Sequence, residues 1–435
     1  MINRLLQRVK KIAQTDFVKV TSLSAVATAI RMIAGFVSVK IVAKIIGPSG
    51  IALVGQFTNF ITMIGSLSTG AIGQGVTKYI AENYDSPDEQ KKIVVHAVRI
   101  TFISTLFFSL LALVFCRQIS WIIFNNDQYT PLVMITAGTL GLYSFNLLLI
   151  NILNGYKGYR KYIILNIISS ILILIFSIFL VVPFGLYGAL VNCIVSQTIV
   201  ILVTLFMVRH EAWFYSLFSK GKIERKVVKK MMGFSLMAIT SAILGPLAQI
   251  SVRKYIAECI SLDMAGIWEG MNRFSSMYLS VITTSIAIYY LPKLSEIKDN
   301  YLLRAEVLKT AKIILPLLAI GCIIIFISRS LIINLLFSSE FKPMENLFAM
   351  QMVGDFLKIS SWLIAFLYFA QAKVKGYIIA EVCGALILVL LSRVMVKQYG
   401  LEGSVYAYSL TYFIYFLIVL FSFRSLFFSP TGLNR

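Results

Sequence analysis

Apolar stretches of membrane-spanning length follow one another along this chain, separated by short polar segments. A helix of roughly 20 apolar residues crosses a hydrocarbon core about 30 Å thick. About twelve stretches reach that length, and we place them at residues 21–46, 51–80, 93–116, 131–153, 162–182, 185–208, 231–256, 265–291, 311–336, 345–370, 376–396 and 402–424. The pattern predicts an all-α integral membrane protein with about twelve transmembrane helices.

The first two stretches meet at a short segment of turn-forming residues, Gly47-Pro48-Ser49-Gly50. Proline ends a helix, and glycine readily adopts the positive φ angles that a tight turn requires. We therefore expect the chain to turn at this segment and to enter the second helix at once.

The longest polar loop, residues 209–230, divides the chain into two halves. The halves share a weak similarity, because Ser38-Val39-Lys40 and Ser251-Val252-Arg253 end the first and the seventh stretch. Transporters built from such repeats place their substrate sites between them. We predict a six-helix lobe over 21–208, a basic cytoplasmic linker over 209–230 and a second six-helix lobe over 231–435.

Lysine and arginine are distributed unequally between alternate loops. With the N-terminus inside, the inner segments carry about 26 of these residues and the outer loops about 6, and such a bias marks the cytoplasmic side. Residues 1–20 form a basic amphipathic segment that we expect on the cytoplasmic membrane surface. The distribution predicts a multi-pass protein with both termini in the cytoplasm.

The composition excludes a soluble globular fold. Of 435 residues, 58% are hydrophobic and 14% are charged, against about 45–50% and about 25% in soluble chains. The net charge of +21 comes from cations spread between apolar stretches, so they do not form a nucleic-acid-binding domain. The five cysteines lie far apart without C-x-x-C spacing, and there are two histidines, so neither a disulfide framework nor a metal site is indicated.

Several cations fall inside predicted membrane helices, where a charge costs at least about 2.5–3.5 kcal/mol. Arg31 stands twelve residues beyond Lys19, about 18 Å along a helix, so it lies near mid-membrane and is a candidate functional cation. Lys40 lies on the opposite face of a straight helix and can line the same cavity only if the helix bends, for which Gly35 is the candidate position. Lys40 and Lys78 are otherwise explained by snorkelling to the interface.

Carboxylates also fall inside predicted membrane helices. Glu269 is four residues from Arg273, and Asp355 is three residues from Lys358, so each of these acids has a partner within reach on its own helix. Glu381 has no such partner. A carboxylate in hydrocarbon can bind and release a cation, so Asp355 and Glu381 are candidates for a proton or sodium site, with Glu269 as a further coupling or gating residue.

The balance of deep charge is cationic. A cavity lined by cations attracts an anion, and the planar donors of arginine suit phosphate oxygens. The sequence contains no P-loop and no G-x-S-x-G motif, so neither ATP hydrolysis nor another enzyme activity is indicated. The residues therefore predict a secondary transporter for an anionic or lipid-bearing substrate, with no catalytic residue, metal or cofactor.

Five groups of residues follow one another along nearly the whole chain in an order that is characteristic of one family. They are Gly47 to Leu53, Gly73 to Ala81, Gly266 to Gly270, Tyr290 to Ser295, and Gln351 to Lys358 with Ala380-Glu381-Val382. In these segments the chain resembles the Wzx-type flippases, which include the O-antigen flippases and the lipid III flippase of enterobacterial common antigen synthesis.

This resemblance implies the fold of the multidrug/oligosaccharidyl-lipid/polysaccharide exporter superfamily, with two six-helix lobes around a central cationic cavity. It implies movement of an undecaprenyl-diphosphate-linked oligosaccharide (an O-antigen repeat unit or lipid III) from the cytoplasmic to the periplasmic leaflet of the bacterial inner membrane. It also implies transfer of that lipid to a polysaccharide polymerase and a chain-length regulator. Together with Arg273, the positions that resemble basic cavity residues of the family are expected to bind the diphosphate, namely Arg31, Lys40, Lys78, Arg253 and Lys254.

Two other functions stay open. A multidrug or organic-cation antiporter of the same fold would call for acidic cavity residues, and the basic first stretch argues against it. A membrane polysaccharide polymerase would call for a large periplasmic loop with catalytic residues, whereas the predicted outer loops are short. Neutral replacements of Arg31 and Arg253 separate the flippase from the antiporter, because lipid transport would fall and cation export would not.

Overall fold

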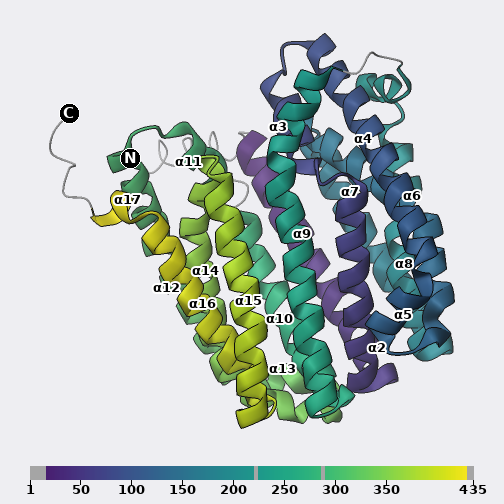
Figure 1. Ribbon diagram of the computed structural model, residues 1–435, viewed down its shortest axis with the longest axis vertical. Helices are drawn as coiled ribbons and strands as arrows, with labels where there is room; N and C mark the ends of the chain where they lie inside the picture. Colours follow the sequence, from purple (N-terminus) through teal and green to yellow (C-terminus); the bar gives the residue numbers. More distant parts are fainter. Residues whose placement is uncertain (1–15, 220–223, 286–289, 429–435) are drawn as a thin grey trace, which may run out of the picture. The chain divides into compact units, whose positions relative to one another are not determined.

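The described part of the chain is helical throughout (Figure 1). The computed structural model describes residues 16–219, 224–285 and 290–428, and no β-strand occurs among them. The predicted all-α class is therefore confirmed. Most of the predicted surface segment 1–20 lies outside the described residues, as do residues 220–223 of the predicted linker.

The helices follow one another with short connections. The long ones are α2 (Asp16–Ser68), α4 (Pro87–Val114), α6 (Thr130–Gly155), α7 (Tyr159–Phe176), α8 (Val182–Val208), α9 (Arg225–Cys259), α10 (Leu262–Ser285), α12 (Asn300–Ile327), α14 (Phe348–Ala370), α15 (Val374–Tyr399) and α16 (Glu402–Ser422). The short ones are α3 (Gly73–Glu82), α5 (Cys116–Phe124), η1 (Asp127–Tyr129), η2 (Ser177–Val181), η3 (Ala212–Phe218), α11 (Leu291–Glu296), α13 (Arg329–Leu336), η5 (Ser339–Leu347) and α17 (Arg424–Phe428).

Eight helical segments among the described residues are long and apolar enough to cross a bilayer. One of them, Tyr159–Val208, runs for 50 residues, and α2 runs for 53 residues with a break inside it. Both exceed the roughly 20 residues that a single pass needs. The chain is a multi-span membrane protein, and the predicted number of about twelve passes is compatible with these lengths but stays a prediction.

Contacts divide the chain into two compact units. Unit 1 comprises the described residues of Met1–Ile41, Ile64–Ile122 and Asn126–Ser235, and unit 2 those of Val42–Met63, Ile123–Asn125 and Leu236–Arg435. The segment Val42–Met63 lies in unit 2, although the sequence places it within the lobe 21–208. Its Ala52 packs in one apolar cluster with Val252 of α9 and Trp268 of α10, so the second part of α2 is held by helices of the C-terminal half.

The predicted turn at residues 47–50 is the point at which α2 breaks. Gly47 has φ 64° and ψ −172°, a conformation that residues with a Cβ rarely adopt. Helix α10 approaches this break closely, because a Cβ built on Gly266 would lie 1.7 Å from the carbonyl oxygen of Pro48. Gly35, the other candidate for a bend, lies within continuous helix.

Replacing Gly266 by alanine is expected to destabilise unit 2 strongly. The added methyl group would overlap backbone rather than a movable side chain, and overpacking of this kind typically costs about 1–3 kcal/mol or more. Gly245 of α9 is the matched control, because a Cβ there meets nothing within 4 Å. Thermal unfolding in detergent should show a lower midpoint temperature for Gly266→Ala than for the wild type, and an unchanged midpoint for Gly245→Ala. Equal midpoints for the two variants would mean that the contact with Pro48 is not tight.

The predicted second stretch, residues 51–80, is interrupted in the structure. Helix α2 ends at Ser68 and α3 begins at Gly73. Gly70 and Ala71 between them have φ angles of 67° and 52°, which no helix contains. The prediction of one continuous helix was wrong because the apolar pattern continues through a turn that only the backbone angles reveal.

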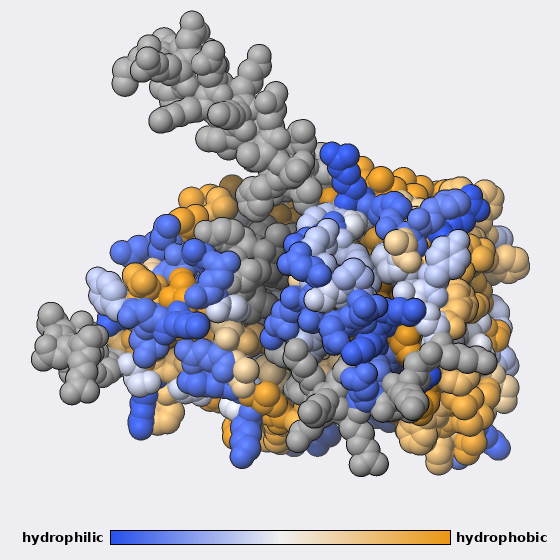
Figure 2. Space-filling model, turned by 90° about the horizontal axis from the view of Figure 1, so that it is seen from above, coloured by the Kyte–Doolittle hydropathy of each residue, from blue (hydrophilic) through white to orange (hydrophobic). Residues whose placement is uncertain are grey.

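Figure 2 shows hydrophilic residues gathered on the face toward the viewer and hydrophobic residues at its edges. Large apolar side chains stand exposed on the helices, including Phe102 on α4 at 69%, Leu317 on α12 at 67% and Ile327 at 71%. Surfaces of this kind are stable against lipid rather than water. In unit 2, α14 and α15 both pack against α16 (Figure 1).

Candidate functional site

A buried ion cluster in unit 2 is centred on Glu269 of α10. Arg253 of α9 donates from Nη2 to Oε2 of Glu269 and from Nη1 to Oε1 of Gln56 at 2.7 Å. Arg273 donates from Nε to Oε1 of Glu269 at 2.8 Å. Arg253 is 2% exposed and Glu269 is 6% exposed, so the cluster joins α2, α9 and α10 inside protein.

The cluster assigns different roles to residues that the sequence grouped together. The predicted pair of Glu269 and Arg273 is confirmed. Arg253 also forms an ion pair with Glu269, so each carboxylate oxygen of Glu269 is paired with a guanidinium group. The two arginines leave the cluster with one net positive charge. Arg273, whose side chain is 24% exposed, is the arginine of the cluster that can reach a ligand.

A second buried acid, Asp355 of α14, accepts hydrogen bonds from several neutral groups. The hydroxyls of Ser275 and Tyr278 donate to its Oδ2, the former at 2.6 Å. The hydroxyl of Tyr408 donates to Oδ1 at 2.7 Å, and Nε2 of Gln351 lies 3.3 Å from the same oxygen. Asp355 is fully buried, so three helices, α10, α14 and α16, converge on one carboxyl group.

Lys358 of α14 lies among aromatic rings instead of pairing with Asp355. Its Nζ is 5.3 Å from the ring centre of Trp362, 5.9 Å from that of Tyr408 and 5.4 Å from that of Tyr412. A cation within about 6 Å of a ring face is stabilised by the ring quadrupole. The ion pair considered from the spacing of Asp355 and Lys358 does not form among the described residues, because hydroxyl groups occupy the carboxylate.

Glu381 of α15 has its hydrogen-bond partner on a different helix. The hydroxyl of Tyr415 on α16 donates to its Oε1 at 2.8 Å. Tyr415 is one of three tyrosines on α16 whose rings are in contact. The ring centres of Tyr408 and Tyr412 lie 4.8 Å apart, and those of Tyr412 and Tyr415 lie 6.3 Å apart. A row of tyrosines therefore links the surroundings of Asp355 to those of Glu381.

Sequence reasoning did not identify this row, although a signal for it exists. The three tyrosines are spaced i, i+4 and i+7, which places them along one helix face. Tyrosine at that spacing supplies hydroxyl donors at successive turns of a membrane helix. In the described part of the chain, no three histidine, cysteine or acidic side chains gather as metal ligands would. The groups gathered around this row are two carboxyl groups, one lysine and hydroxyls.

The other predicted cations stand elsewhere on α2, α3 and α9. Arg31 and Lys40 are exposed on the first part of α2, which belongs to unit 1. Lys78 of α3 is also in unit 1 and pairs with Glu82 at 3.6 Å. Lys254 of α9 pairs with a nearby acid, Glu258, at 3.9 Å in unit 2. A single cationic site formed by all of these residues stays a prediction.

The family of the chain follows from its sequence. Residues 17–298 match the family model described as polysaccharide biosynthesis protein, which is well over half of the chain. The chain belongs to the polysaccharide biosynthesis protein family. The match covers α2 to α11 and so includes Arg31, the ion cluster around Glu269 and the serine and tyrosine of α10 that donate to Asp355.

Two lipid III flippases resemble this chain over almost its whole length. The lipid III flippase of Escherichia coli (strain K12) is 30% identical over 403 residues, which is 92% of this chain and 96% of the relative. The lipid III flippase of Shigella flexneri matches with the same identity and coverage. The similarity thus extends into both units.

Solved structures show the fold of this family member. An inward-facing multidrug resistance MATE family transporter of the MOP superfamily superposes with a TM-score of 0.75 at 15% identity, covering 93% of this chain and 98% of that chain. The lipid II flippase MurJ in an inward closed conformation superposes with a TM-score of 0.71 at 16% identity, covering 92% of this chain and 87% of that chain. The chain has the fold of the MOP superfamily, as its resemblance to the Wzx-type flippases implied.

Proposed function

We propose that this protein is a transporter that moves an undecaprenyl-diphosphate-linked oligosaccharide from the cytoplasmic to the periplasmic leaflet of the bacterial inner membrane. The observation that carries this function is the 30% identity to lipid III flippases over 92% of the chain and 96% of the relative. The superposition on a lipid II flippase supports the same class of fold. The chain is a flippase rather than an enzyme, and its substrate is a lipid-linked oligosaccharide, as lipid III or an O-antigen repeat unit would be.

The charged residues supply what such a substrate requires. A diphosphate that leaves water loses its hydration, and fixed positive charge must replace it. Arg31 and Lys40 are exposed on α2, and Arg273 retains an exposed edge in unit 2. We assign these three to direct contact with the diphosphate. Arg253 instead acts through Glu269, because its guanidinium is buried and already hydrogen-bonded.

The carboxyl groups of unit 2 are the proposed coupling site. Tyr408 donates to Asp355 and Tyr415 donates to Glu381. Tyr412 lies between these two tyrosines on α16 and has Lys358 near its ring. Binding of a proton or a sodium ion would alter the hydrogen bonds among α10, α14 and α16 when it occurs at Asp355, and the bond between α15 and α16 when it occurs at Glu381. A packed helix group with two such hydrogen-bonded arrangements can link an ion gradient to alternating access.

The orientation of the protein in the membrane and the destination of the transported lipid complete the proposal. We propose that both termini lie in the cytoplasm and that the translocated lipid passes to a polysaccharide polymerase with its chain-length regulator. The excess of lysine and arginine in alternate loops supports that orientation. A multidrug antiporter shares the fold, but fold alone does not define a substrate, and the exposed cations of α2 do not favour an organic cation.

Replacement of a related flippase in cells tests the proposed function. In an Escherichia coli strain that lacks its lipid III flippase, this chain is expected to restore the polymer that is made from lipid III, or an O-antigen in a matched O-antigen strain. Expression in a drug-sensitive strain is expected to leave drug tolerance unchanged. Raised drug tolerance without restored polymer in any matched strain would contradict the flippase and favour the antiporter.

A further inference from the structure

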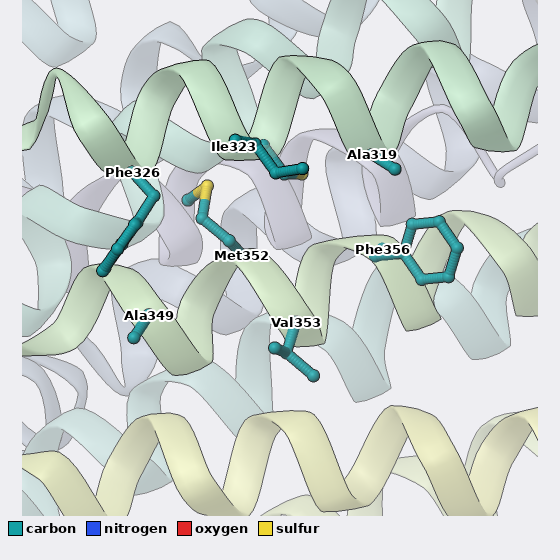
Figure 3. Close-up of a pocket in the computed structure, with 8 residues that line it drawn as sticks. Ala319, Ile323, Phe326, Ala349, Met352, Val353 and Phe356 are labelled. Carbon is teal, nitrogen blue, oxygen red and sulfur yellow. The ribbon is translucent and has the colours of Figure 1, made fainter.

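An open apolar groove runs between α12 and α14 in unit 2 (Figure 3). It has a volume of about 450 Å³, within the roughly 300–1,000 Å³ of pockets that hold small ligands. Figure 3 shows side chains of α12 on one wall and those of α14 on the other, with Phe326 and Ala349 at one end and Ala319 and Phe356 at the other. The full lining is Ala319, Cys322, Ile323, Phe326, Ala349, Met352, Val353 and Phe356.

The side chains that line the groove do not favour polar ligands. All eight lining residues are apolar or weakly polar, and the walls offer neither an ionised group nor an amide. Small side chains, Ala319 and Ala349, alternate with aromatic rings and leave the space that the groove occupies. A flexible hydrocarbon chain fits such a surface because it gains from burial of apolar area and needs no hydrogen bonds.

A cation stands at one end of the groove. Arg329 begins α13, and its guanidinium lies 4.5 Å from the ring centre of Phe326 and donates to the carbonyl oxygen of Phe326 at 3.0 Å. It forms no ion pair among the described residues. Of the two acids of η5, Glu345 accepts a hydrogen bond from Ser330 and Glu340 lies against Gly47. An anionic headgroup at Arg329 would place its attached hydrocarbon at the mouth of the groove.

The groove also touches the proposed coupling site. Met352 lines the groove and accepts a hydrogen bond at 3.6 Å from the hydroxyl of Tyr278, which also donates to Asp355. Helix α14 therefore carries the groove on one face, through residues spaced 349, 352, 353 and 356, and Asp355 and Lys358 beside it. An occupant of the groove contacts the helix that bears the coupling carboxyl group.

We infer that, after the lipid has left Arg31, Lys40 and Arg273, the α12–α14 groove binds its polyprenyl tail while Arg329 binds its diphosphate. This inference rests on the proposed function and specifies how that substrate is held. In the predicted topology Arg329 lies towards the periplasmic side, so the groove receives the tail in the leaflet where the product is released. The bound tail then contacts Met352, which shares the hydroxyl of Tyr278 with Asp355.

Retention of undecaprenyl diphosphate by the purified protein, measured by native mass spectrometry, tests this groove without requiring transport. Ala349→Trp fills the groove from an exposed position and is expected to lower retention about tenfold by removing apolar burial. Ile324→Trp is the matched control, because Ile324 is 58% exposed on α12 and does not line the groove. Val353→Phe replaces Ala349→Trp if the latter does not fold.

The headgroup contact has its own pair of variants. Arg329→Ala is expected to reduce the preference for undecaprenyl diphosphate over phosphatidylglycerol, whereas Arg393→Ala, an exposed cation of α15, is expected to preserve it. Equal retention by Ala349→Trp and Ile324→Trp, or no preference over phosphatidylglycerol in the wild type, would overturn the groove assignment even if the protein translocates lipid. Groove-dependent retention without translocation would leave the groove standing and overturn the proposed function instead.

Discussion

Replacing Glu269 by alanine is expected to cause one of the two largest losses among single substitutions in this protein. It removes the counterion of Arg253, which is 2% exposed, and the partner of Arg273. Breaking a buried ion pair by deleting one member costs about 3–5 kcal/mol, since the remaining charge stays buried without compensation. Thermal and denaturant unfolding in detergent should show this loss in unit 2.

Two further variants make the result specific to the buried cluster. Glu258→Ala removes an exposed pair with the same i,i+4 spacing, to Lys254, and is expected to cost about 0–1 kcal/mol. Replacing both buried charges, in Arg253→Met with Glu269→Leu, is expected to recover most of the stability. Wild-type stability of Glu269→Ala would contradict the cluster.

The second large effect is expected at Asp355 and concerns both stability and coupling. Asp355→Ala leaves the buried hydroxyls of Ser275, Tyr278 and Tyr408 without their acceptor. Each unsatisfied buried donor costs about 1–3 kcal/mol, so this variant should be poorly folded. Asp355→Asn keeps the size and one carbonyl oxygen, and is expected to fold yet to translocate lipid at a rate that no longer responds to a proton or sodium gradient.

Gradient response in proteoliposomes measures this outcome. Glu258→Gln is the control, because Glu258 is an exposed carboxylate of the same unit and should retain the wild-type response. Retained gradient dependence in Asp355→Asn would remove Asp355 from the coupling site and leave Glu381 as its candidate.

Local spacing predicted the features that one helix or one turn determines. The turn at Gly47 follows from glycine and proline in the sequence, and the pairing of Glu269 with Arg273 follows from their spacing of four. Hydropathy predicted the all-α membrane class because lipid-facing helices must be apolar. These predictions require no knowledge of which helices are neighbours.

Contacts between distant segments could not be predicted in the same way. Arg253 is bound by Gln56, which lies 197 positions away, and Asp355 is bound by Tyr408, 53 positions away. Serine, tyrosine and glutamine occur throughout membrane helices, so their type does not identify which of them faces a buried charge. The assignment of Arg253 to the buried cluster, and of Arg273 to its exposed edge, therefore needed the packing of α2, α9 and α10.

The single measurement that tests the flippase most directly is leaflet accessibility of an undecaprenyl-diphosphate-linked oligosaccharide in proteoliposomes that contain only this protein. Transfer is expected to require the protein and to fall about tenfold in Arg31→Ala, since a hydrogen bond to a charged group contributes about 1.5–3 kcal/mol and about 1.4 kcal/mol is a factor of ten in rate. Lys44→Ala, an exposed cation of the same helix, should transfer lipid as the wild type does. Failure of the wild-type protein to move any such lipid, together with gradient-driven movement of a small organic cation, would contradict the flippase.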